Sequence, residues 1–198
     1  SYNSIHTISN SIISDNESLN SYGGGISSTP RHGAEVGSFH PSFSKITIDN
    51  STISANSAHG HGAGIYSSMY YYSTSIYHVY SIVNISNSKI FGNISTNWGD
   101  GGGIYSHARF STVNMDNCEV YDNSARNGGG VFTLTENPSA VSHTTINRST
   151  FYDNYAYWSG GGLSSTAATC NVNINHSTFM NNSALDKGGA MTCSYNAS

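Results

Sequence analysis

Residues 151–163 read FYDNYAYWSGGGL and contain the two motifs that decide the fold. In Phe151-Tyr152-Asp153-Asn154, an apolar residue stands three positions before an asparagine. In Gly160-Gly161-Gly162-Leu163, small residues directly precede another apolar residue. The first motif occurs six times and ends at Asn16, Asn56, Asn93, Asn123, Asn154 and Asn182. The second follows each copy, with its apolar residue 8 to 11 positions later, at Ile26, Ile65, Ile104, Val131, Leu163 and Met191. A tandem array with this period predicts a solenoid.

Alternating apolar residues precede each asparagine motif. Four units have apolar residues both seven and five positions before the apolar residue of the motif: Ile46/Ile48, Val83/Ile85, Val113/Met115 and Val172/Ile174. The first and fifth units have only the second of the two, as Ile8 and Ile146. This period of two predicts a strand with one buried face. A turn, often with Asn, a second strand and a third strand behind the glycines complete each unit. The asparagines are 40, 37, 30, 31 and 28 residues apart, so we expect one all-β domain over 1–198, a three-sided parallel β-helix of about six coils.

The first two spacings are long enough to hold insertions, which we place at about 27–45 and 67–82. The second contains Tyr70-Tyr71-Tyr72 and Tyr77, His78 and Tyr80. We expect it to form an extra hairpin or flap on the solenoid wall.

The recurrent asparagines are expected to point inward and to hydrogen-bond along the axis, as amides do in stacked strands. Asn also tolerates the left-handed backbone of a sharp corner, which we therefore assign to the ladder positions. The glycines before the third strand are expected at a corner where no Cβ fits.

The pairing of Phe-x-x-Asn with Gly-Gly-[Ala/Gly]-apolar resembles the repeat of chlamydial polymorphic outer membrane proteins and related right-handed parallel β-helix proteins. The clearest copies are Phe179-Met180-Asn181-Asn182 with Gly188-Gly189-Ala190-Met191, and the stretch quoted first. The resemblance covers roughly residues 5–193 and implies a right-handed helix. It implies no single function, because such helices serve as adhesins, surface stalks and polysaccharide-active enzymes.

Composition narrows the function classes. Only 9% of residues are charged and the net charge is −4, which argues against the basic stripe of a nucleic-acid binder. No apolar run approaches the roughly 20 residues that span a bilayer. Three cysteines make no disulfide framework. Cys118 takes a position that holds Ser in the other units, which predicts a small buried thiol. The coil register places Cys170 and Cys193 close together, and they are either joined by a disulfide or free.

Two carboxylates are the candidates for chemistry. Asp122 and Asp153 precede the recurrent asparagine in adjacent coils, where a polysaccharide hydrolase or lyase would place its acids. Arg126 and Arg148 are the nearest bases for a lyase. A weak Ca2+ site between the acids is a further option. We favour the simpler interpretation that Asp-Asn makes a good corner, and so expect no catalytic site. His59-Gly60-His61 lacks a metal-ligand spacing and is expected to be a flexible loop, so no metal site is assigned.

Aromatic residues form two columns that we expect to face outward. One comprises Phe91, Tyr121, Tyr152 and Met180, and the other comprises Tyr66, Tyr105 and Phe132. Such columns stiffen the wall by cross-strand stacking, or bind sugars or another subunit.

Glycosylation sequons, Asn-x-Ser/Thr, are frequent. Register places Asn84, Asn147 and Asn175 on the outer face, Asn50 at a turn and Asn196 near the end, and we expect N-glycans there. Asn16 and Asn93 also lie in sequons but belong to the inward ladder, so we expect them to be bare.

No capping unit is recognisable, so both ends are expected to expose strand edges. The chain is then either a fragment of a longer solenoid or a subunit that stacks head to tail with itself. We therefore expect a secreted, N-glycosylated structural β-helix of an extracellular filament, stalk or sheath. The alternatives are a surface adhesin that binds carbohydrate and a polysaccharide lyase or glycoside hydrolase.

Overall fold

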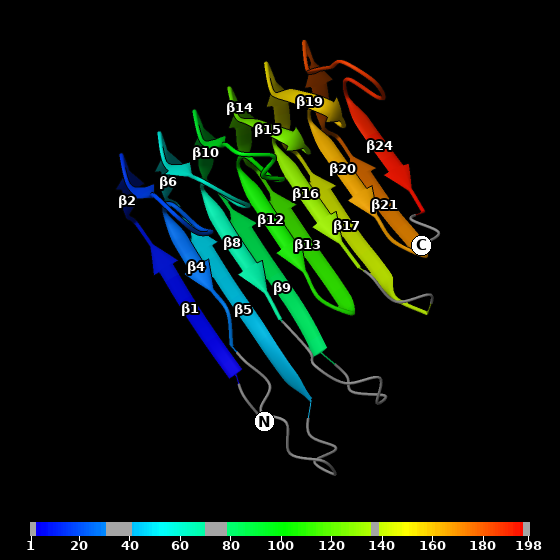
Figure 1. Ribbon diagram of the computed structural model, residues 1–198. Helices are drawn as coiled ribbons and strands as arrows, with labels where there is room; N and C mark the ends of the chain where they lie inside the picture. Colours follow the sequence, from blue (N-terminus) through cyan, green and yellow to red (C-terminus); the bar gives the residue numbers. More distant parts are fainter. Residues whose placement is uncertain (1–2, 31–40, 70–78, 136–138, 196–198) are drawn as a thin grey trace.

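The computed structural model describes residues 3–30, 41–69, 79–135 and 139–195. They form a right-handed parallel β-helix whose six coils lie side by side from the N-terminus to the C-terminus (Figure 1). Every pair of neighbouring strands in the four six-stranded sheets is parallel and joins successive coils. The predicted all-β parallel β-helix of about six coils is therefore confirmed.

Each coil contributes one strand to each sheet. Sheet A comprises β1 (Asn3–Ser9), β5 (Ser42–Asp49), β9 (Val79–Ser86), β13 (Phe110–Asp116), β17 (Val141–Asn147) and β21 (Thr169–Asn175). Sheet B comprises β2 (Ile12–Ser14), β6 (Thr52–Ser54), β10 (Lys89–Phe91), β14 (Glu119–Tyr121), β18 (Thr150–Tyr152) and β22 (Thr178–Met180). Sheet C comprises β3 (Glu17–Ser18), β7 (Ser57–Ala58), β11 (Ile94–Ser95), β15 (Ser124–Asn127), β19 (Tyr155–Ser159) and β23 (Ser183–Ala184). Sheet D comprises β4 (Ile26–Ser28), β8 (Ile65–Ser68), β12 (Ile104–His107), β16 (Val131–Leu134), β20 (Leu163–Thr166) and β24 (Met191–Ser194).

The expectation of three strands per coil was wrong. Sheet C lies in the segment between the recurrent asparagine and the glycines, which the sequence pattern marked only as a variable loop. Its strands are two to five residues long. So short a strand shows no alternation of its own and forms because the neighbouring coil pairs with it.

Three left-handed corners separate the four strands of every coil. The first lies between sheets A and B, at Asn10, Asn50, Asn87, Asn117, Arg148 and His176, with φ between 46° and 52°. The second precedes the ladder asparagine, at Asp15, Ala55, Gly92, Asp122, Asp153 and Asn181. The third is the first glycine of each cluster, at Gly23, Gly62, Gly101, Gly128, Gly160 and Gly188. Left-handed backbone therefore lies one residue before the ladder asparagines and not at them, which corrects the assignment made from sequence.

The ladder asparagines have the inward orientation and the contacts that were predicted. The Nδ2 atoms of Asn16, Asn56, Asn93, Asn123 and Asn154 each donate to Oδ1 of the next asparagine, over 2.8–3.0 Å. That Oδ1 also accepts the backbone N–H of the same residue, as in Asn93 to Asn123 at 3.1 Å. Nδ2 further donates to a carbonyl of the preceding coil, as in Asn123 to Ile90 at 2.9 Å. Asn56, Asn93, Asn123 and Asn154 are essentially inaccessible to solvent.

Aliphatic side chains of sheets A, B and D fill the interior, where Ile46, Ile53 and Ile65 are fully buried. The glycine corner leaves no room for side chains: a Cβ at Gly130 would lie 2.5 Å from the carbonyl oxygen of Gly162. The expected glycine corner is thus confirmed, and it follows from packing between coils as well as from φ.

A second internal column consists of hydroxyl groups between sheets A and D. Ser44 bonds Ser28 at 2.6 Å and Ser67 at 2.8 Å, and the chain of contacts continues through Ser81, Ser106 and Ser111. Thr133, Ser142 and Ser165 repeat the arrangement in later coils. In the sixth coil the register places Cys170 on Ser142 and Cys193 on Ser165. The two cysteines form a disulfide, with Cα atoms 6.3 Å apart, which replaces the hydroxyl pair of that coil.

Strands lie at the edges of both ranges expected to be insertions: β4 ends at Ser28, β5 begins at Ser42, β8 ends at Ser68 and β9 begins at Val79. The expected flap around Tyr70-Tyr71-Tyr72, Tyr77 and His78 lies outside the described residues. Tyr80 belongs to β9 and stacks on Phe110, with ring centroids 5.2 Å apart.

Asn123→Ala should lower the free energy of unfolding by about 3 kcal/mol or more, because it leaves buried donors and acceptors on two neighbouring coils unpaired. Asn114→Ala is the matched control in the same coil. Asn114 is exposed and bonds Asn84 at 2.9 Å, so its loss should cost less than about 0.5 kcal/mol. Urea unfolding followed by circular dichroism measures both. Equal losses would show that the internal ladder has no special role.

Candidate functional site

The first aromatic column lies on the outer side of sheet B, as predicted. Phe91 and Tyr121 stack with centroids 4.6 Å apart and planes 3° apart, and Tyr121 and Tyr152 stack equally closely. Their register follows from the pairing of β10, β14 and β18. Desolvation by the stack raises the pKa of the Tyr121 phenol above its ordinary value. The rings cover one another's faces, which favours the structural interpretation of this column.

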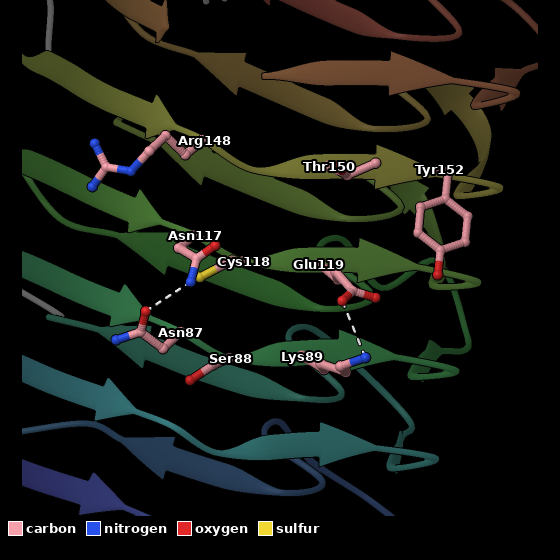
Figure 2. Close-up of a pocket in the computed structure, with 9 residues that line it drawn as sticks. All are labelled: Asn87, Ser88, Lys89, Asn117, Cys118, Glu119, Arg148, Thr150 and Tyr152. Atoms are coloured by element: carbon pink, nitrogen blue, oxygen red, sulfur yellow. Dashed lines mark hydrogen bonds and ion pairs between the residues drawn. The ribbon is translucent and has the colours of Figure 1, made fainter. Parts of the chain in front are cut away.

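An open, polar pocket lies beside this column, at the corner between sheets A and B (Figure 2). It is lined by Asn87, Ser88, Lys89, Asn117, Cys118, Glu119, Arg148, Thr150 and Tyr152. Lys89 Nζ lies 3.1 Å from Glu119 Oε1, and Asn117 Nδ2 donates to Asn87 Oδ1 at 2.8 Å (Figure 2). Arg148 pairs with Asp116 at one side. The charges are thus paired with one another across the coils.

Cys118 lies at the base of this pocket and has the buried position that its register predicted. Its Sγ lies 3.3 Å from the carbonyl oxygen of Asp116. Burial raises the pKa of the thiol to about 11, so the thiolate is scarce at neutral pH. The pocket therefore offers hydrogen-bonding groups but no activated nucleophile at Cys118.

The second aromatic column is not available on the surface, contrary to expectation. Tyr66, Tyr105 and Phe132 are 1%, 3% and 4% exposed and stack on one another outside the main core. The alternation does turn them away from the core, but Tyr22 and His61 stack against this column. The residues before the glycine corner therefore cover the outer side of sheet D.

Those covering residues form a column of their own, one position before the left-handed glycine of each coil. His61 Nδ1 accepts the backbone N–H of Asp100 at 2.9 Å. The Asp100 carboxylate, whose side chain is 4% exposed, accepts Arg126 Nε at 2.8 Å, Arg126 Nη2 at 2.6 Å and Asn127 Nδ2 at 2.9 Å. Ser159 Oγ continues the column by donating to Asn127 Oδ1 at 2.8 Å.

The electrostatics of this column follow from these bonds. Because Nδ1 of His61 is an acceptor, the neutral ring carries its proton on Nε2. Desolvation lowers the pKa of His61, and the nearby Asp100 carboxylate opposes that shift only in part. The bidentate bond to Asp100 raises the pKa of Arg126. His61 is thus part of an ordered side-chain column and not of a flexible loop, which corrects the sequence-based interpretation.

No metal centre emerges in the described part of the chain, where no group of three His, Cys, Asp or Glu side chains converges. His59 is exposed, and its Nδ1 atom lies 3.5 Å from Nδ2 of Asn97. The ring of His61 is instead stacked between Tyr22 and Tyr105. The two histidines therefore do not act as a ligand pair.

Asp122 and Asp153, the alternative catalytic acids and Ca2+ ligands, stand at the second left-handed corner, with φ of 53° and 55°. Ala55, Gly92 and Asn181 hold the same place in other coils. Corner geometry alone accounts for the two acids, and Arg126 is held by Asp100 instead. The lyase or hydrolase hypothesis gains no support from this arrangement.

The orientations of the sequons at Asn84, Asn147, Asn175 and Asn93 agree with the register, whereas Asn16 differs in exposure. Asn84 and Asn147 lie on the outer face of sheet A, where their Oδ1 atoms accept bonds from Asn114 and Asn175. Asn175 and Asn50 are exposed, whereas Asn93 is fully buried in the ladder. Asn16 is exposed because no coil covers it on one side, so burial alone does not exclude a glycan there. Asn196 lies outside the described residues.

Sequence reasoning missed the Asp100–Arg126 pair and the exposed rings of Trp98, Tyr157 and Trp158 beside it. Aligning the coils on the first glycine of each cluster would have placed Tyr22, His61, Asp100, Asn127 and Ser159 in one column. Their side-chain contacts could not be read from that alignment, because they depend on how the loop folds back over sheet D.

Protonation of His61 should destabilise the fold. Its pKa is lowered on folding, so the stability that neutral His61 contributes is present above the unfolded pKa of ~6.5 and is lost as the pH falls through the folded value. We expect the melting temperature to fall between pH 7.5 and 5, and His61→Gln to weaken that dependence. His59→Gln, at an exposed position two residues away, should leave the pH dependence unchanged. A pH dependence that is identical in all three proteins would contradict this role.

Comparisons with protein-family models, with curated proteins and with solved structures found no match to this chain. The resemblance to the repeats of polymorphic outer membrane proteins thus rests on the quoted motifs. In the described segments there is no helix of the length and apolarity needed to cross a membrane.

Proposed function

We propose that this chain is an N-glycosylated structural β-helix, a subunit of an extracellular filament, stalk or sheath that grows by head-to-tail stacking. The observation that carries the proposal is the direction of the asparagine ladder. Within each step, the earlier coil donates a backbone N–H and Nδ2, and the later coil accepts both at one Oδ1. Every coil therefore has a donating and an accepting side.

The two end coils keep this polarity. Among the described residues, Oδ1 of Asn16 accepts no bond and the backbone N–H of Asn182 donates none. One end face thus offers an acceptor and the other a donor in the same column. A second copy placed head to tail would join them as the internal coils are joined. This contact is heterologous and does not close, so it generates a fibre.

The apolar interior is also incompletely covered at both end faces. Ile8 and Ile13 in the first coil and Phe179 in the sixth are only partly buried. Their counterparts Ile48, Ile53 and Phe151 are fully buried. Stacking would bury these faces and pair the backbone groups of the outer strands, which are otherwise open to association.

Two features support an extracellular setting. The Cys170–Cys193 disulfide is of a kind that persists in oxidising compartments. The outward sequons at Asn84 and Asn147 would place glycans on sheet A, away from both end faces. Glycans there would coat the rod without blocking the stacking contact.

Glycan occupancy should follow orientation. Peptide mass mapping of protein secreted from a eukaryotic host should find glycan at Asn84, Asn147 and Asn175, then at Asn50 and Asn196, and none at Asn93. Asn93 is the internal control, because its sequon is intact while its Nδ2 is buried in the ladder. Glycan on Asn93 with none on Asn147 would overturn the assignment.

Association should depend on the end face. We expect sedimentation to show growing species as concentration rises, with fibres that diffract at ~4.8 Å along their axis. Ile13→Lys should abolish association, since stacking would bury an unpaired charge. Ile12→Lys is the matched control, because Ile12 is 76% exposed on the outer wall of the same strand. A monomer at all concentrations, or equal effects of both variants, would contradict head-to-tail stacking.

A further inference from the structure

The only two tryptophans of the chain lie together on the outer side of sheet C. The ring centroids of Trp98 and Trp158 are 5.8 Å apart, and that of Tyr157 is 5.7 Å from Trp98. The three residues are 58%, 46% and 46% exposed, in contrast to the covered rings on sheet D. Coils 3 and 5 thus contribute to one exposed aromatic cluster, which we call the tryptophan cluster.

The backbone of Trp98 is unusual. Asn97 and Trp98 have φ of 47° and 63°, and Gly99 N–H donates to the Thr96 carbonyl at 2.9 Å, which closes a tight turn. The turn presses on the neighbouring coil, because a Cβ at Gly99 would lie 2.1 Å from the carbonyl oxygen of Gly60. Positive φ is rare for a bulky residue, and such strain concentrates at functional sites. No other described non-glycine residue with positive φ carries a large apolar ring.

A second irregularity presents the other two rings. β15 and β19 pair regularly at Ala125 and Ala156, but the next pair is Asn127 with Ser159. Tyr157 and Trp158 therefore stand together opposite Arg126, as in a β-bulge. The bulge breaks the alternation, so two consecutive aromatic side chains are exposed on the same face. Bulges of this kind re-aim side chains beside binding sites.

The charged residues beside the tryptophan cluster are paired with one another. The Arg126 guanidinium lies 5.3 Å from the centre of the Trp158 ring and is neutralised by Asp100. Lys187 and Asp186 are paired with each other at 3.6 Å, and Asp186 N–H donates to the Trp158 carbonyl. Exposed rings beside charges that already neutralise one another suit a ligand that has apolar C–H faces, many hydroxyls and no charge.

We propose that the tryptophan cluster, Trp98, Tyr157 and Trp158, is a binding site for a neutral oligosaccharide. The aromatic rings stack on pyranose rings, and the polar side chains around them receive the hydroxyl groups. The site lies on the lateral wall of the rod and does not depend on stacking at the end faces. Failure of the filament proposal would therefore leave this one standing.

Intrinsic fluorescence tests the site directly, because both tryptophans of the chain belong to it. The probes are the neutral hexasaccharides of β-1,4-linked glucose, N-acetylglucosamine and mannose, with hexagalacturonate as the anionic comparison. We expect a saturable blue shift with at least one neutral probe and none with hexagalacturonate. Trp98→Asn should weaken binding about tenfold or more by removing one stacking ring.

Two further comparisons separate binding from folding and from self-association. Asn tolerates positive φ, so Trp98→Asn should keep the melting temperature of the parent protein or raise it. Tyr121→Ala, which removes an aromatic residue from the wall of sheet B, should leave the affinity unchanged. No response to any neutral probe up to ~10 mM, an equal response to hexagalacturonate, or unchanged affinity in Trp98→Asn would each overturn the proposal. A fluorescence change with protein concentration alone, lost in Trp98→Asn, would instead assign the cluster to a contact between copies.

Discussion

The structure depends on one hydrogen-bonding arrangement, in which an asparagine amide replaces a backbone partner inside a turning chain. Where each coil bends from sheet B to sheet C, the backbone N–H of the ladder asparagine cannot reach a carbonyl of the next coil. The Oδ1 of the next asparagine accepts it instead, together with an amide proton from the side chain. Leaving this buried backbone N–H without a partner would cost more free energy than the hydrogen bond to the amide contributes on balance. The requirement applies at every coil, which explains why one residue type recurs at this position.

The same constraint accounts for the left-handed corners. The residue before the ladder asparagine must turn the chain so that the amide points inward, and it does so with φ near 55° whether it is Asp, Ala, Gly or Asn. Asp122 and Asp153 are therefore interchangeable in structure with Ala55. Their repetition in adjacent coils, which suggested a pair of catalytic acids, arises from backbone geometry shared by all six coils.

The sequence predicted what depends on a strict period and missed what depends on irregularity. The inward columns, the coil number and the outward face of the sequons were readable because equivalent residues lie one above another. Sheet C could not be predicted from the sequence, because its strands are short. The burial of Tyr66 and Tyr105 could not be predicted either, because residues from another part of the coil cover them. The turn at Trp98 and the bulge at Tyr157 and Trp158 interrupt the period, so periodic reasoning could not find them. Those interruptions are nevertheless where the candidate binding surface lies.

The replacement of a hydroxyl pair by Cys170 and Cys193 distinguishes the sixth coil from the five coils before it. A solenoid held by contacts between neighbouring coils loses its order from the ends, where each coil has one neighbour instead of two. In the sixth coil the bond joins β21 to β24 and closes the turn covalently. The first coil has no such closure within the described residues. The disulfide thus adds a covalent constraint inside the sixth coil, whereas the other coils are closed by hydrogen bonds and packing alone within the described residues.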